Sequence, residues 1–146
     1  MYFELDRDYR PELLDELWAC DAIHLSGGNT YHFLHWLRKR ELFEPLRRYV
    51  AGGGVLIGVS AGGILMTPEI SISGLLGDTP LPELEDLTAL GLVDFSFAPH
   101  LNTLKDWKPL RDYARRNNRT IYGCRDGVGL LVDGENIEFI GDIIVF

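Results

Sequence analysis

The sequence has few cysteines and no long apolar run. Its two cysteines, Cys20 and Cys124, form no CxxC pair and suggest no disulfide framework. No apolar stretch approaches the roughly 20 residues that a membrane-spanning helix needs, and the acidic residues among the first six are unlike a signal peptide. These absences favour a protein of the reducing cytoplasm.

Positive charge is also scarce. The 146 residues contain 14 Lys and Arg against 22 Asp and Glu, so the formal net charge is −8. Nucleic-acid binding and adhesion to an anionic membrane both require a basic face, so both functions are disfavoured. Hydrophobic residues make up 46% and charged residues 25% of the chain, which is typical of a globular protein, and the length predicts one domain over residues 1–146.

Apolar runs alternate with helical patterns along the first half of the chain, which predicts an α/β fold with an open, mostly parallel sheet flanked by helices. Residues 55–57 (Val-Leu-Ile) lack polar alternation, so we expect a strand buried on both faces. A loop is expected from 67 to 87, and turns such as Asp133-Gly134 indicate antiparallel strands at the C-terminal end. The other predicted elements are strands at 2–5, 22–25, 92–98, 120–122, 127–132, 136–140 and 143–146, and helices from Pro11 and at 30–40, 45–51 and 103–117.

Residues 58–62 read Gly-Val-Ser-Ala-Gly and match G-x-S-x-G directly after the predicted buried strand. A nucleophile elbow holds its serine in a strained turn between a strand and a helix, so the neighbouring residues must be small. Gly58, Ala61 and Gly62 meet this requirement. Ser60 is therefore the candidate nucleophile, and the backbone N–H of Ala61 is a candidate oxyanion donor. The alternative is a glycine-rich turn with an incidental serine.

A second glycine-containing loop, Ser-Gly-Gly-Asn-Thr at 26–30, follows the predicted strand at 22–25. In open α/β sheets the ligand crevice lies outside the carboxyl ends of the strands, so this loop and the elbow are expected to face one crevice. The N–H of Gly28 is a candidate second oxyanion donor. The alternative is a turn in which Asn29 or Thr30 caps the next helix.

The candidate general base is His100, which follows a predicted strand at the expected crevice. The candidate acid that orients it is Asp126, in a loop between two predicted strands, whereas Asp94 is a weaker choice. A salt bridge to a basic neighbour is the alternative role for Asp126. His24 lies within an apolar strand and is expected to be a core residue.

Patterns for cofactors and metals are missing. The sequence contains neither GxGxxG nor GxxxxGK. His32 and His35 lie three residues apart on a predicted helix without a third ligand nearby, so they are expected to form a solvated helix face. We expect no metal and no organic cofactor.

Three stretches together resemble the peptidase E family of serine dipeptidases, which are specific for N-terminal aspartate, are related to cyanophycinases and have a fold like that of class I glutamine amidotransferases. The stretches are Ser-Gly-Gly-Asn-Thr at 26–30, Ile-Gly-Val-Ser-Ala-Gly-Gly at 57–63, and Ala-Leu-Gly-Leu-Val with Ala-Pro-His-Leu-Asn within 89–102. The resemblance implies that Ser60 is the nucleophile and His100 the base. It further implies that Gly28 and Ala61 form the oxyanion hole and that Asn29 and Thr30 lie near the substrate.

The sequence departs from this family at three points. Family members usually carry Glu as the third triad member, and the matching residue here is Asp126, one methylene shorter. The family holds the substrate aspartate with an arginine after the histidine; that segment is shorter here, and Arg111, Lys105 and Lys108 are the candidates. Family members also open with a further βα unit, so we expect an N-terminally shortened sheet with an uncovered edge or face.

The sequence thus predicts a serine peptidase that hydrolyses short peptides, namely dipeptides with an N-terminal Asp, through a Ser-His-Asp triad. Arg111 is the predicted contact for an acidic side chain. The uncovered apolar surface predicts a homo-oligomer, a dimer. The alternatives are a non-catalytic amidotransferase-like binding or assembly module and an esterase of broad specificity.

Overall fold

The structure is a computed structural model that describes residues 1–102 and 107–146. Helices and strands alternate along its first half, as predicted. The helices are α1 (Glu12–Trp18), α2 (Thr30–Lys39), α3 (Phe43–Ala51), α4 (Ala61–Ile64), α5 (Ile72–Leu75) and α6 (Lys108–Asn117). The strands are β1 (Ala22–Leu25), β2 (Val55–Gly58), β3 (Ser96–Ala98), β4 (Ile121–Gly123), β5 (Gly129–Asp133), β6 (Asn136–Ile140) and β7 (Ile144–Val145).

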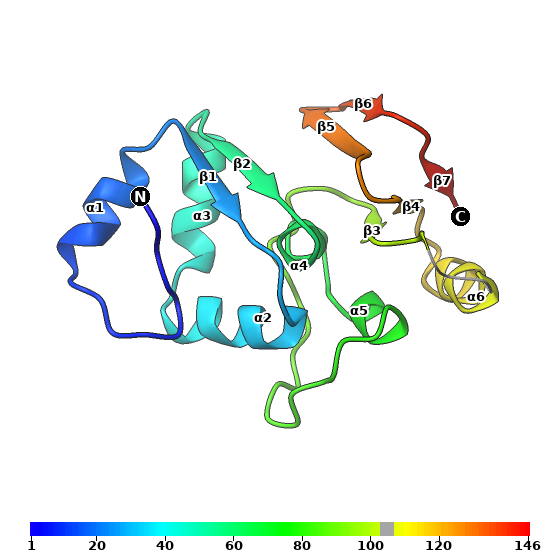
Figure 1. The fold of residues 1–146 in the computed structure, drawn as a ribbon, viewed down its shortest axis with the longest axis horizontal. Coiled ribbons are helices and arrows are strands. Elements are labelled where there is room, and N and C mark those ends of the chain that lie inside the picture. The colour runs from blue at the N-terminus through cyan, green and yellow to red at the C-terminus, as the bar shows by residue number, and fades with distance from the viewer. Residues whose placement is uncertain (103–106) are drawn as a thin grey trace.

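The strands combine parallel and antiparallel pairs. β1 pairs in parallel with β2, β3 pairs in parallel with β4, and β7 joins β4 antiparallel. β5 and β6 form an antiparallel hairpin closed by the predicted turn. Among the described residues these strands form three separate hydrogen-bonded sheets rather than the single open sheet that we predicted. In Figure 1, α4 lies between the β1–β2 pair and β3, and it contacts both.

The β1–β2 sheet is covered on one face only. Ile23 and Leu25 are buried, but on the opposite face Val55 is 55% and Ile57 48% exposed. The prediction of a strand buried on both faces is therefore wrong, because the described helices pack against one side of the pair. His24 is paired with Ile57 on the exposed face, so its predicted core position is also wrong.

The core lies on the covered face and is continuous from α2 to α6. Leu34 and Leu37 of α2 are fully buried, and Leu110 and Tyr113 of α6 follow the same i, i+3 spacing. The other buried apolar side chains of this core belong to Ile64, Leu65, Ile70, Ile72, Ala89, Leu90, Ala98, Leu101 and Ile121. α4 is buried at its centre and contacts β1, β2 and β3, so it fixes the strand ends relative to one another.

A polar cluster ties α6 to the segment before α5. The hydroxyl of Tyr113 donates to the carboxylate of Glu69, and the Ser71 hydroxyl lies 3.0 Å from the same phenol oxygen. Burial and the bond to Glu69 raise the pKa of Tyr113, so the phenol stays protonated at neutral pH. The cluster holds α5 and α6 together next to β3.

Four predicted elements differ from the structure. Residues 2–5 form no strand, and the carbonyl of Leu5 accepts a hydrogen bond from Arg40 instead. The predicted loop at 67–87 contains α5, whose Ile72 is fully buried. The predicted strand at 92–98 is confined to β3. The predicted helix at 103–117 is described from Lys108, and its residues 103–106 lie outside the described part of the chain.

Within the described ranges, no helix has both the length and the apolar character needed to cross a bilayer.

Candidate active site

Ser60 occupies a strained turn between β2 and α4. Its φ of 56° and ψ of −116° lie outside the regions that L-residues favour, and such a conformation persists only when its surroundings fix it. The N–H of Val59 donates to the carbonyl of Leu25, and the N–H groups of Gly63 and Ile64 donate to the carbonyl of Ser60. The turn thus has the strand-to-helix geometry that the G-x-S-x-G pattern predicts.

Small residues are required around the turn because the backbone packs against itself. A Cβ placed on Gly62 would lie 2.1 Å from the carbonyl oxygen of Leu25, and one on Gly58 would lie 2.7 Å from the carbonyl carbon of Gly62. A Cβ on Gly63 would meet the ring of Phe97 at 2.7 Å. No side chain fits at these positions without moving the elbow.

The loop at 26–29 lies directly against the elbow. Gly62 donates its N–H to the carbonyl of Ser26 at 3.1 Å. A Cβ on Gly27 would lie 3.4 Å from the Cβ of Ser60. The two predicted loops therefore share one surface, and Gly28 has a φ of +136° that glycine adopts without strain.

Asn29 and Thr30 both take part in structural hydrogen bonds. The Asn29 side chain accepts the N–H of His32 as the cap of α2 and donates to the carbonyl of Thr79. Thr30 is fully buried, and its N–H and hydroxyl both donate to the carboxylate of Asp78. The capping role is confirmed for Asn29, and contact of either residue with a substrate stays a prediction.

His100 connects the elbow to Asp126. Its Nε2 lies 2.9 Å from the Oγ of Ser60, and its Nδ1 lies 2.7 Å from Oδ1 of Asp126. In the neutral imidazole that fits both contacts, Nδ1–H donates to the carboxylate and Nε2 accepts the serine proton. The two residues follow β3 and β4, which pair in parallel, so their side chains leave from neighbouring strand ends. Asp94 is exposed and precedes β3, and the carboxylate at His100 is that of Asp126.

The base and the acid stand on an open surface. The side chain of His100 is 60% exposed and that of Asp126 is 64% exposed. Two residues before Asp126, by contrast, Cys124 is 2% exposed, and burial raises the pKa of its thiol. The core therefore ends within two residues of the candidate acid.

One backbone amide at the elbow is available to an oxyanion. The N–H groups of Gly62, Gly63 and Ile64 donate to backbone carbonyls, whereas in the part of the chain that the structure describes no such bond engages the N–H of Ala61. This amide lies at the start of α4, next to Ser60. The oxyanion role of Ala61 and Gly28 stays a prediction that this arrangement permits.

Arg111 and Lys108, two of the three basic candidates for an acidic side chain, lie on α6. Arg111 is exposed on α6 and, within residues 1–102 and 107–146, forms no hydrogen bond or ion pair with Ser60, His100 or Asp126. Lys108 donates to Asp112 at 2.5 Å, which lowers the pKa of that carboxyl group. Lys105 lies outside the described residues.

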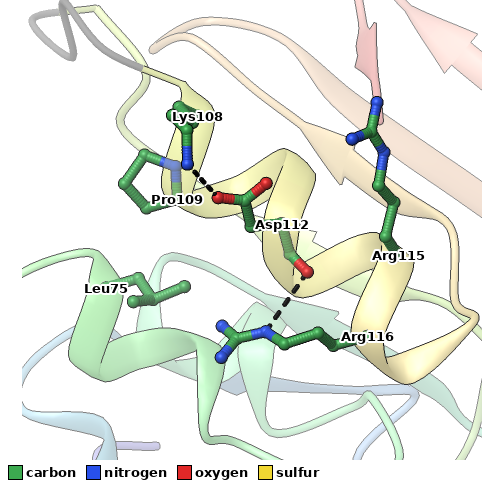
Figure 2. Close-up of a pocket in the computed structure, with 6 residues that line it drawn as sticks. All are labelled: Leu75, Lys108, Pro109, Asp112, Arg115 and Arg116. Atoms are coloured by element: carbon green, nitrogen blue, oxygen red, sulfur yellow. Dashed lines mark hydrogen bonds and ion pairs between the residues drawn. The ribbon is translucent and has the colours of Figure 1, made fainter.

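A separate pocket of about 510 Å³ lies between α5 and α6. Figure 2 shows Asp112 at its centre, bonded to Lys108 through its side chain and to Arg116 through its backbone carbonyl. Its lining is formed by Leu75, Lys108, Pro109, Asp112, Arg115 and Arg116; it includes the candidate Lys108 but none of Ser60, His100 and Asp126. For metals, no group of three or more His, Cys, Asp or Glu within the described ranges is arranged to hold an ion.

Two hydrogen-bonded pairings near the site were not predicted from the sequence. Asp78, in a loop predicted only as a connection, binds Thr30 over a separation of 48 residues. Asn102 accepts the N–H of Asp126 over 24 residues. Neither pairing follows from local pattern, because each partner lies on a different element.

Comparison with known proteins supports the fold and identifies a family. An α/β structure with a serine at a strained strand-to-helix turn is typical of proteins with a nucleophile elbow. A family model identifies the family: the model of peptidase family S51 matches residues 3–140. The chain belongs to peptidase family S51.

Relatives and a solved structure support the same assignment. A peptidase E of Shewanella sp. (strain MR-4) is 32% identical over 135 residues, covering 84% of this chain and 54% of the relative. A peptidase E of Nostoc sp. (strain PCC 7120) is 29% identical, covering 99% of this chain and 62% of the relative. The crystal structure of a candidate peptidase E from Listeria monocytogenes EGD-e superimposes with a TM-score of 0.77 at 26% identity, covering 94% of this chain and 67% of that one. The chain spans about half the length of the curated relatives it matches.

Proposed function

We propose that this protein is a serine peptidase that hydrolyses dipeptides with an N-terminal aspartate through Ser60, His100 and Asp126. The observation that carries the proposal is the continuous hydrogen-bonded chain from the Ser60 hydroxyl through both nitrogens of His100 to the Asp126 carboxylate. In such a chain the imidazole takes the serine proton and the carboxylate orients and stabilises the imidazole.

In the first half of the reaction, Ser60 Oγ attacks the peptide carbonyl carbon while its proton passes to Nε2 of His100. The carbonyl oxygen becomes an oxyanion, which accepts hydrogen bonds from the N–H groups of Ala61 and Gly28. His100 then gives its proton to the leaving amine, and the peptide bond breaks to leave an ester on Ser60. Asp126 keeps Nδ1 protonated and stabilises the imidazolium between these steps.

In the second half, a water molecule attacks the ester and gives its proton to Nε2 of His100. Breakdown of the second oxyanion returns that proton to Ser60 Oγ and releases the carboxylic acid. Both halves use the same two amides and the same imidazole, so no further group is needed for the balance of protons.

The substrate class is supported by the curated relatives, of which several are named peptidase E. A net charge of −8 repels acidic substrates at long range, so selection of aspartate requires a local cation. Arg111 is our candidate. We expect Arg111→Ala to raise KM for Asp-Leu about tenfold and to leave Ala-Leu hydrolysis unchanged, with Arg115→Ala on the same helix as the matched control.

The decisive experiment compares hydrolysis of Asp-Leu and Ala-Leu by the wild type and by Ser60→Ala. We expect a preference for Asp-Leu and a fall in kcat of at least about 1,000-fold in Ser60→Ala. Thermal unfolding of the variant checks that it is folded. Equal turnover by Ser60→Ala would refute the mechanism, and equal rates on both dipeptides would refute the aspartate preference alone.

A further inference from the structure

Besides the contact between His100 and Asp126, three hydrogen bonds join the end of β3 and the loop after it to the loop after β4, and these three flank His100. Cys124 donates its N–H to the carbonyl of Ala98, and Leu101 donates its N–H to the carbonyl of Cys124, both at 2.9 Å. The third bond runs from the N–H of Asp126 to Oδ1 of Asn102, also at 2.9 Å. Only this third bond uses a side chain, and only it reaches the candidate acid.

The first two bonds are fixed by the core. Leu101 is 2% exposed, and a Cβ on Gly123 would lie 2.5 Å from Cδ1 of Leu101. His100, between Ala98 and Leu101, has a φ of +61°. A non-glycine residue keeps such a backbone only where its neighbours hold it. Packing and backbone bonds therefore position the base.

Packing does not position the acid. Arg125, Asp126 and Gly127 are all exposed, and Gly127 has a φ of +86°. Within the described residues, Asp126 is held by a backbone bond to Asn102 and a side-chain bond to His100. An exposed carboxylate gains little from an ion pair alone, since water solvates it equally well.

We propose that Asn102 is a positioning residue that keeps the Asp126 carboxylate against Nδ1 of His100. This inference rests on the proposed function, since it concerns the same triad. Asn102 follows His100 by two residues, so its bond to Asp126 closes a ring that runs through His100, Leu101, Asn102 and Asp126. The amide N–H that Asn102 accepts is one bond from the Cα of Asp126, so this contact sets the direction of the carboxylate. Without it, the exposed aspartate rotates into water and His100 loses the partner that selects its tautomer.

The test is a double-mutant cycle on Asp-Leu hydrolysis with Asn102→Ala and Asp126→Ala. We expect Asn102→Ala to lower kcat about tenfold with KM unchanged, the loss expected when one positioning hydrogen bond is removed. In the Asp126→Ala background the same substitution is expected to have no further effect, because Asn102 acts through Asp126. Asn102→Asp keeps an acceptor oxygen and is expected to recover part of the loss. Asn136→Ala, an exposed asparagine on β6, is the matched control.

A second readout does not depend on turnover. Nitrogen-15 NMR of His100 in alkaline buffer reports which ring nitrogen carries the proton. We expect the Nδ1–H tautomer in the wild type and in Asn136→Ala, and a shift toward Nε2–H in both Asn102→Ala and Asp126→Ala. A wild-type tautomer in Asn102→Ala, or additive losses in the cycle, would overturn the positioning role. Unchanged turnover in Ser60→Ala would instead overturn the proposed function and leave the NMR result standing.

Discussion

The nucleophile and its two partners are held in different ways. Around Ser60 the backbone of β1, β2 and α4 packs so closely that a Cβ on Gly58 or Gly62 would lie under 3 Å from a backbone atom, and one on Gly63 would lie 2.7 Å from the ring of Phe97. Around His100 and Asp126 the side chains are more than half exposed, and hydrogen bonds between two loops set their positions. The serine is therefore fixed by excluded volume, whereas the acid is fixed by a few replaceable polar contacts.

This contrast predicts which substitutions abolish turnover completely and which lower it only partly. Where backbone atoms already touch, an added side chain has no space to occupy, so the whole elbow must shift. A lost hydrogen bond on an exposed loop leaves water as a substitute partner, so its effect is partial.

Gly62→Ala is expected to have the largest effect, because its Cβ would lie 2.1 Å from the Leu25 carbonyl oxygen. We expect a loss of about 3 kcal/mol in the free energy of unfolding and no measurable turnover. Chemical denaturation and Asp-Leu hydrolysis measure the two losses. Gly129→Ala is the matched control, since a Cβ there meets nothing within 4 Å. Equal stability of the two variants would show that the elbow can relax.

Asp126→Asn is expected to lower kcat about 100-fold, less than the roughly 10⁴-fold loss for a buried triad aspartate. The reason is that Asp126 is 64% exposed, so water replaces part of its role. Stability should stay close to that of the wild type. A kcat as low as that of Ser60→Ala would show that catalysis depends on Asp126 as strongly as on Ser60.

Asp78→Ala is expected to cost about 2 kcal/mol in the free energy of unfolding, because the buried N–H and hydroxyl of Thr30 lose their acceptor. Asp78 lies outside the elbow but secures the start of α2, which follows the loop at 26–29. Asp142→Ala, at an exposed position, is expected to change stability by about 0.5 kcal/mol or less. Similar unfolding midpoints for the two variants would contradict this role.

The smallest effect concerns Cys124, which marks the point where the packed core meets the exposed loop. Burial raises the pKa of its thiol, so less thiolate is present at mildly alkaline pH than in an exposed cysteine. We expect iodoacetamide to label Cys20 first and Cys124 only after denaturant is added, as read by mass spectrometry in wild type and Cys20→Ser. Rapid labelling of Cys124 in the native protein would show that Cys124 belongs to the exposed loop and not to the packed core.

Much of the site could be predicted from sequence because it depends on local chemistry. Ser60 needs small neighbours next to it in the chain, and His100 and Asp126 each follow an apolar run that forms a strand end. Whether one face or both faces of the β1–β2 pair are covered could not be predicted, because an apolar run looks the same in either case. Val55 of β2 and His24 of β1 are exposed. Asp78 and Asn102 were missed because their partners lie 48 and 24 residues away.

The order of strands across the molecule has a consequence for how the sequence can vary. Ser60, His100 and Asp126 are separated by 40 and 26 residues along the chain, yet each stands just past the end of a strand. Their mutual distances are set by how the strands and α4 pack and by the short loops at the strand ends, and the rest of the intervening chain takes no direct part. Insertions and deletions between them can therefore accumulate without moving the reactive atoms. In a distant homologue, these three residues are better located by the ends of the strands than by their spacing along the chain.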